Sequence, residues 1–138
     1  MRREPDTLPE TPSELEALYW TARTPLATRR AIIERLGRAQ NLTSANALSR
    51  IFDRDRRLEM QMQVLQTLGD FAAADCQSVK FAVFSRAAGP THPKTMRLGA
   101  MQSLSDQGDP RARPLLQGMA NDPDGAIRKN ARRLVEEK

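Results

Sequence analysis

Few side chains in this sequence could act as a nucleophile, a general base or a metal ligand. The chain has one His, one Cys and one Tyr, which are His92, Cys76 and Tyr19, and they lie in unrelated segments. Acid–base and covalent catalysis need a nucleophile and a base held close together, and a zinc site needs several His or Cys ligands at short spacing. The sequence also lacks a Gly-rich phosphate loop and an HExxH motif. We therefore expect no catalytic residue, no metal and no cofactor, and a protein that is not an enzyme.

Two pairs of acidic residues have the spacing of paired carboxylates, Asp53 with Asp55 and Asp122 with Asp124. Each pair falls in a turn that we expect between two helices, where acidic side chains cap helix N-termini and interact favourably with the helix dipole. We interpret both pairs as structural and not as acid–base catalysts.

A helical pattern repeats four times along the chain and positions these residues. The segments TRRAIIERLG, MQMQVLQTLG, MRLGAMQSLS and IRKNARRLVE occupy 28–37, 60–69, 96–105 and 127–136. Their ninth residues, which we take as anchors, are Leu36, Leu68, Leu104 and Val135, and their second residues are Arg29, Gln61, Arg97 and Arg128. Apolar residues at the fifth and ninth positions fall on one helical face. The anchors recur at intervals of 32, 36 and 31 residues, which indicates a two-helix repeat.

Four further helical segments alternate with these, at 13–23, 43–54, 74–88 and 110–121. Pro and Gly mark the turns between them, and no stretch has the alternating pattern of a strand. The predicted fold class is all-α, a right-handed α-solenoid of four helix hairpins and eight helices. The repeats are expected at about 12–39, 43–70, 74–106 and 110–138, within a single domain from 12 to 138, because each hairpin must bury its apolar face on its neighbours. Residues 1–11, rich in Pro and acids, are expected to be a flexible tail.

Several motifs resemble HEAT repeats: NDPDGAIRKNARRL at 121–134, MRLGAMQSLSDQGDP at 96–110, and Leu-Gly at 36–37 and 68–69. The similarity is to the short HEAT-like repeats of bilin-lyase-like bacterial families, whose hallmark is an Asp-Pro turn followed by Val-Arg, small residues and Leu-Gly. It covers almost the whole chain. Bilin lyases use two subunits with larger repeats, so the resemblance implies the repeat fold and not their activity.

The resemblance also implies a role for the Arg at the second position of each segment, which in this family bonds an acid in the turn. We therefore expect Arg128 to pair with Asp122. In the second copy Gln61 stands where the Arg would be, and we expect Asp55 to have lost that partner.

Binding to another protein is the function that we predict. In HEAT-like proteins the second helices line the concave face, so the resemblance implies a partner surface at their outward positions. These positions are Arg30, Glu34, Arg38, Met62, Gln66, Asp70, Leu98, Gln102, Asp106, Lys129 and Arg133. Their mixed charges, amides and apolar Met62 and Leu98 fit a protein segment better than a polyanion. We predict a non-catalytic interaction or scaffold module, with the basic first half of the chain steering an acidic partner.

Nucleic-acid binding is the alternative function. The net charge is +5, and residues 29–57 contain eight Arg against three acids. The residues expected to contact phosphate in this case are Arg50, Arg54, Arg56 and Arg57. Aromatic residues make up only 4% of the chain, so platforms for base stacking are few. We interpret the adjacent Tyr19 and Trp20 as a cover for the end of the stack or as an anchor for a partner.

The compartment is suggested by what the sequence lacks. A single Cys fits a reducing environment, and the sequence has neither a secretory signal nor an apolar run long enough to span a membrane. We expect a cytoplasmic protein that does not associate with membranes.

Overall fold

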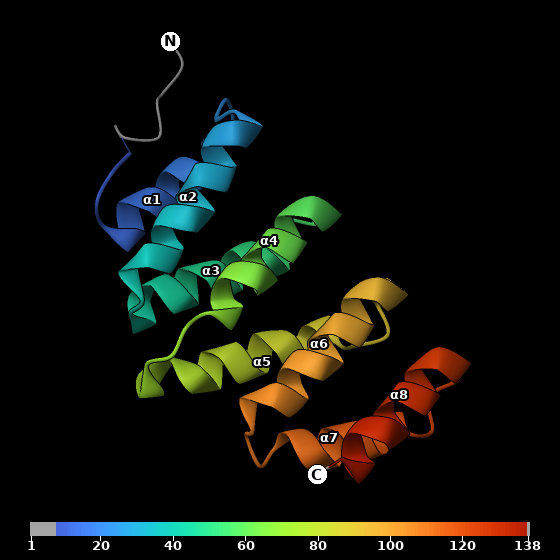
Figure 1. Ribbon diagram of the computed structural model, residues 1–138. Helices are drawn as coiled ribbons and strands as arrows, with labels where there is room; N and C mark the ends of the chain where they lie inside the picture. Colours follow the sequence, from blue (N-terminus) through green and yellow to red (C-terminus); the bar gives the residue numbers. More distant parts are fainter. Residues whose placement is uncertain (1–7, 138) are drawn as a thin grey trace. The chain divides into compact units, whose positions relative to one another are not determined.

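The computed structural model describes residues 8–137 of the chain. These residues form eight α-helices and a short 3-10 helix, with no β-strand (Figure 1). The elements are α1 (Pro12–Tyr19), α2 (Leu26–Ala39), α3 (Leu42–Arg54), α4 (Leu58–Gly69), η2 (Ala74–Cys76), α5 (Gln77–Ala87), α6 (Lys94–Gln107), α7 (Ala112–Met119) and α8 (Gly125–Glu136). The predicted all-α fold of helical hairpins with eight helices is confirmed.

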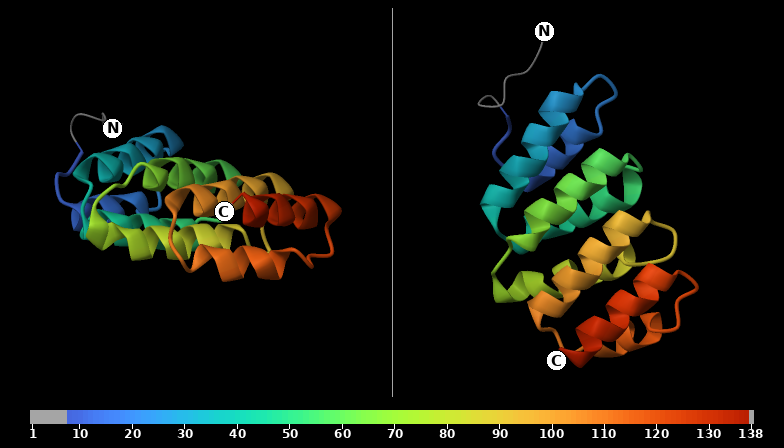
Figure 2. Two further views of the ribbon diagram at one scale, coloured as in Figure 1. Left: turned by 60° about the horizontal axis from the view of Figure 1, so that its bottom comes forward. Right: turned by 45° about the vertical axis from the view of Figure 1, so that its right-hand side comes forward.

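The chain divides into two compact units, and the boundary falls within α5. Unit 1 is Met1–Lys80 and unit 2 is Phe81–Lys138. Within unit 1, α1 packs on α3 and α2 packs on α4, so the first helices form one layer and the second helices another (Figure 2). Within unit 2, α6 packs beside α8, and α7 packs against both. The single domain expected for residues 12–138 stays a prediction.

The predicted N-terminal tail lies mostly outside the described residues. Of its remaining residues, Leu8 is only 6% exposed. Thr11 caps α1, because its hydroxyl oxygen accepts a hydrogen bond from the Glu14 backbone N–H at 3.2 Å. The end of the predicted tail that the structure describes is therefore part of unit 1.

The anchor positions lie in the core in three of the four hairpins. Leu36, Leu68 and Leu104 are completely buried. In α8 the completely buried residue is Leu134, whereas Val135 is half-buried, so the predicted anchor is wrong by one residue. Ile127, Ala131 and Leu134 are separated by four and then three residues, a spacing that keeps all three on one helical face.

A side-chain donor from the second helix of each hairpin binds a carbonyl at or just beyond the end of the first helix. The four bonds are Arg29 Nη2 to Thr21 O at 3.1 Å, Gln61 Nε2 to Phe52 O at 2.9 Å, Arg97 Nε to Ala88 O at 2.9 Å and Arg128 Nη1 to Asp122 O at 2.9 Å. Phe52 O is one of the last carbonyls of α3, which have no partner inside the helix. The other three carbonyls belong to the turn that follows the first helix. Gln61 makes this bond although it replaces an Arg.

Candidate functional site

A buried carboxylate, Asp55, lies at the turn between α3 and α4 in unit 1. Its side chain accepts a hydrogen bond from Tyr19 Oη at 2.6 Å and two from the Arg57 guanidinium, at 2.6 and 3.0 Å. Gln61, at the second position, does not bind Asp55, as expected, but Tyr19 and Arg57 replace the missing Arg as partners. Burial by itself would raise the pKa of Asp55, but the hydrogen bonds from Arg57 and Tyr19 outweigh it and hold the pKa at about 2. Burial and the neighbouring Asp55 raise the pKa of Tyr19.

Tyr19 and Trp20 have different environments. Tyr19 is completely buried and binds Asp55, so it is a core residue of unit 1. The Arg29 guanidinium lies over the Tyr19 ring, 5.5 Å from its centroid. Trp20 is half-buried and makes an edge-to-face contact with Tyr19, while the Arg54 guanidinium lies 4.8 Å from the Trp20 ring centroid.

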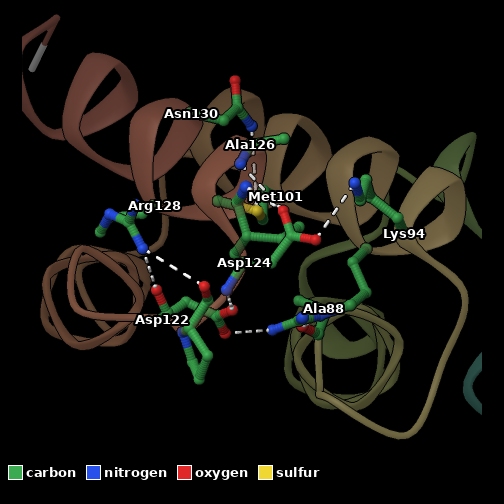
Figure 3. Close-up of polar contacts among 11 residues, drawn as sticks. Ala88, Lys94, Met101, Asp122, Asp124, Ala126, Arg128 and Asn130 are labelled. Atoms are coloured by element: carbon green, nitrogen blue, oxygen red, sulfur yellow. Dashed lines mark hydrogen bonds and ion pairs between the residues drawn. The ribbon is translucent and has the colours of Figure 1, made fainter.

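In unit 2 the equivalent turn before α8 holds a second acidic cluster (Figure 3). Arg97 Nη2 donates to Asp122 Oδ2 at 2.6 Å, and both side chains are nearly buried. This bond lowers the pKa of Asp122. Asp124 caps α8, because its side chain accepts hydrogen bonds from the backbone N–H groups of Ala126 and Ile127, at 2.9 and 3.1 Å. It also forms an ion pair with Lys94, with 3.1 Å between Lys94 Nζ and Asp124 Oδ2.

The predicted pairing of Arg128 with Asp122 is present, but it is made to the Asp122 backbone carbonyl and not to the carboxylate. Arg128 donates to the backbone carbonyls of Asp122 and Pro123. The Asp122 carboxylate binds Arg97, which belongs to the preceding hairpin, so the second-position Arg reaches the next turn and not its own. Asp55, Asp122 and Asp124 thus act in caps and ion pairs.

A groove between α2 and α4 in unit 1, with a volume of about 720 Å³, collects five of the predicted partner-binding residues. We call it the α2–α4 groove. It is lined by Arg30, Glu34, Gly37, Arg38, Gln40, Gln63, Gln66, Thr67 and Asp70. The two helices approach closely at its floor, where a Cβ atom on Gly37 would lie only 2.5 Å from Thr67 Cγ2.

The polar groups of this groove include both bonded and unbonded side chains. Gln63 Nε2 donates to the Arg30 backbone carbonyl at 3.0 Å and so joins α4 to α2. Arg30 also forms an exposed ion pair with Glu59 at 3.3 Å. Within residues 8–137, Glu34, Arg38 and Gln66 have exposed side chains that no other group binds.

A second groove, between α6 and α8 in unit 2, has a volume of about 590 Å³. We call it the α6–α8 groove. It is lined by Leu98, Ala126, Lys129, Asn130, Arg132, Arg133 and Glu136, three of which belong to the predicted surface. Arg133 is held by Glu137 at 2.7 Å and by Gln102 at 3.2 Å.

The other predicted positions do not line either groove. Met62 lies on α4 and is 39% exposed. Gln102 donates to Asp106 at 3.0 Å on the surface of α6. The predicted surface did not include Gln63, Thr67, Asn130 and Arg132. Each of them directly follows or precedes a predicted residue in the sequence. The polar face of each second helix is therefore wider than the predicted stripe.

Three of the four Arg assigned to phosphate binding have partners within unit 1. Arg50 forms a bidentate pair with Glu16, at 2.6 and 2.8 Å. Arg57 binds Asp55, and Arg54 lies on Trp20. Arg56 is exposed. The predicted nucleic-acid surface is therefore largely used for internal contacts.

Cys76 and His92, which could act as a nucleophile and a base, line neither groove. Cys76 is buried, and burial together with the neighbouring Asp75 raises the pKa of its thiol. His92 lies in the turn before α6. In the part of the chain from 8 to 137, no three His, Cys, Asp or Glu side chains are grouped as metal ligands. The helices of the same part are too short or too polar to cross a membrane.

Comparison with known proteins shows the fold. No protein-family model matches this chain, and no curated protein matches its sequence. In structure the chain is similar to human deoxyhypusine hydroxylase, solved in complex with glycerol, with a TM-score of 0.72 and 19% sequence identity. The match covers 94% of this chain and 45% of the hydroxylase chain, so this chain spans less than half the length of that protein. The two share an all-helical repeat fold.

This comparison corrects one prediction. The expectation that the chain is not an enzyme is contradicted at the level of the fold, because deoxyhypusine hydroxylase, which shares this fold, is an enzyme. At 19% identity the likeness concerns the fold alone, since one fold can carry many functions.

Proposed function

We propose that this chain is a protein-binding module of short HEAT-like repeats, which receives an extended segment of a partner protein in the α2–α4 groove. The observation that carries the proposal is the lining of this groove by charged groups of both signs and by amides from two packed helices. A cytoplasmic location is part of the same proposal.

The dimensions of the groove suit a peptide. The 14 residues of α2 give the helix a length of about 20 Å. An extended segment of about six residues has the same length, at roughly 3.3 Å per residue. A partner segment of that size would lie along the groove without a change in the helices.

The chemistry of the groove suits a peptide better than a nucleic acid. Each peptide unit offers one N–H donor and one C=O acceptor, and a Gln amide such as that of Gln66 provides both complements. Glu34 and Arg38 are available for partner side chains of either sign. Carboxylates at Glu34 and Asp70 would repel phosphates in the same groove.

The test is selection of a displayed library of random peptides on the immobilised full chain, followed by amide NMR of the full chain with the enriched peptides. Binding peptides are expected to shift the amide signals of Glu34, Gly37 and Gln66. A double variant, Glu34→Lys with Gln66→Lys, is expected to weaken binding about tenfold, because it removes a carboxylate and an amide and adds two charges.

The matched control is Glu10→Lys with Gln117→Lys, which makes the same substitutions at exposed positions outside the groove. It is expected to bind like the unmodified chain. Failure to enrich any peptide, or signal shifts confined to residues outside the groove, would contradict the proposal.

A further inference from the structure

We infer that the α6–α8 groove of unit 2 is a separate binding site for an acidic segment of a protein partner, with an apolar side chain of that segment placed on Leu98. The inference concerns unit 2 alone and does not rest on the proposed role of the α2–α4 groove.

Positive charge dominates the α8 side of this groove. Lys129, Arg132 and Arg133 line it, against one carboxylate, Glu136. Within residues 8–137, Lys129 and Arg132 are exposed and have no hydrogen-bond or ion-pair partner. Their charges are therefore available to carboxylates from outside the chain. Arg133 already has contacts to Glu137 and Gln102, which orient its guanidinium at the edge of the groove.

The positions of these residues on α8 explain why they share one surface. Ala126, Lys129 and Arg133 follow each other by three and four residues, so they form a stripe along the helix. Asp124 caps the N-terminus of α8 and pairs with Lys94 of α6, which fixes the beginning of this stripe beside α6. Asp124 of the acidic cluster thus holds the end of α8 that carries Lys129 close to α6.

The α6 side of the groove is apolar. Leu98 is half-buried and faces a stripe whose Lys and Arg side chains have aliphatic stems. An apolar side chain of a partner would bury surface against Leu98 and these stems. An acidic segment that contains such a residue therefore matches both sides of the groove.

A nucleic acid matches this groove less well. None of the residues that line it is aromatic, so no base can stack there. Glu136 lies among the cations and would oppose a run of phosphates. These observations favour a protein partner.

The probe is a short fluorescein-labelled peptide of Asp and Glu with one central Leu, titrated into the full chain by fluorescence anisotropy at low salt. Amide NMR with the same peptide is expected to shift the signals of Leu98, Lys129 and Asn130. The variant Lys129→Glu with Arg132→Glu is expected to weaken binding by about tenfold. Both positions are exposed, and a thermal melt checks that the variant is folded.

The matched control is Arg23→Glu with Arg56→Glu, which changes the net charge equally at exposed positions of unit 1. It is expected to retain most of the binding. An equal loss in both variants would show attraction by net charge only and overturn the inference.

Two further comparisons test the chemistry of the partner. Replacing the Leu of the peptide by Ser, or Leu98 by Ser, is expected to weaken binding about threefold, and the two changes together no further. A duplex DNA of similar charge that binds more tightly than the peptide would overturn the inference. Shifts confined to the α2–α4 groove would also overturn it, while leaving the proposed function intact.

Discussion

Units 1 and 2 stabilise an equivalent turn aspartate by different contacts. Asp55 and Asp122 each lie three residues before the second helix of a hairpin. In unit 2, Arg97 reaches from the preceding hairpin and binds Asp122 directly. In unit 1 the equivalent Arg29 does not bind Asp55, because Tyr19 lies between them and donates its own hydroxyl.

One position accounts for this difference. Tyr19 is ten residues before Arg29, and the residue ten before Arg97 is Ala87. The small Ala87 leaves space for a guanidinium to extend to the next turn, whereas the Tyr19 ring fills that space in unit 1. Arg57 then supplies the positive charge that Arg29 does not bring to Asp55. The comparison shows that the turn acid needs a buried donor and a positive charge, and that these need not come from the same residue.

The largest effect is expected from removing the direct contact in unit 2. Arg97→Met would leave Asp122 without its charge partner and the Ala88 carbonyl without its donor, so it is expected to lower the free energy of unfolding several times as much as Arg29→Met does. Arg29→Met is expected to cost about 1 kcal/mol or less, because Asp55 keeps Tyr19 and Arg57. Denaturant unfolding measures both losses, and amide hydrogen exchange of α6 and α8 locates the first. Equal losses of stability in the two variants would contradict the inference that Asp122 depends on Arg97 while Asp55 does not depend on Arg29.

The second-largest effect is expected when the pH is lowered and Asp55 becomes protonated. Its pKa of about 2 in the folded chain is below the value of about 3.9 for an unfolded Asp. The stability that follows from this difference, about 2 kcal/mol, is complete above about pH 5 and is lost as the pH falls towards 2. Unfolding measured across this range should show a shallower pH dependence for Asp55→Asn than for the unmodified chain. Parallel curves would show that the pKa of Asp55 is the same in the folded and the unfolded chain.

Removing the Tyr19 hydroxyl is expected to have a smaller effect than removing Arg97 or protonating Asp55. Tyr19→Phe keeps the ring but removes the hydrogen bond to Asp55, which is expected to cost about 1.5 kcal/mol. It should also raise the pKa of Asp55, which NMR titration of the carboxyl measures. An unchanged Asp55 pKa in Tyr19→Phe would contradict the role of the hydroxyl.

The smallest effect is expected at the close approach of α2 and α4. Gly37→Ala places a methyl group against Thr67 Cγ2 and is expected to destabilise unit 1 by about 1 kcal/mol. In a Thr67→Ser background the contact is absent, and the same change should be neutral or slightly stabilising, because Ala favours the helix more than Gly. A double-mutant cycle from thermal unfolding measures the coupling. No coupling would show that the helices adjust freely.

The hairpins could be predicted because their information is local. Apolar residues four apart define one face of each helix, and Leu36, Leu68 and Leu104 are buried as that pattern predicts. The same pattern was wrong by one residue in α8, where Leu134 and Val135 are both apolar and the sequence does not distinguish them. Packing against α7 and α6 selects Leu134.

The acidic clusters could not be predicted, since their partners are far apart in the sequence. Tyr19 and Asp55 are 36 residues apart, and Arg97 and Asp122 are 25 residues apart. The helical period placed eight of the predicted partner-binding positions along the two grooves, and their binding role stays a prediction. It did not place Asn130, Arg132 and Glu136 in the α6–α8 groove, because they lie beside the predicted stripe on α8.

The donors at Arg29, Gln61, Arg97 and Arg128 bear on how the chain folds. Each closes its hairpin across only six to nine residues, which keeps the contact order low. Little loop entropy is lost when such a short segment closes. We expect hairpins to form early and rapidly, each from its own sequence, before the slower docking of one hairpin on the next.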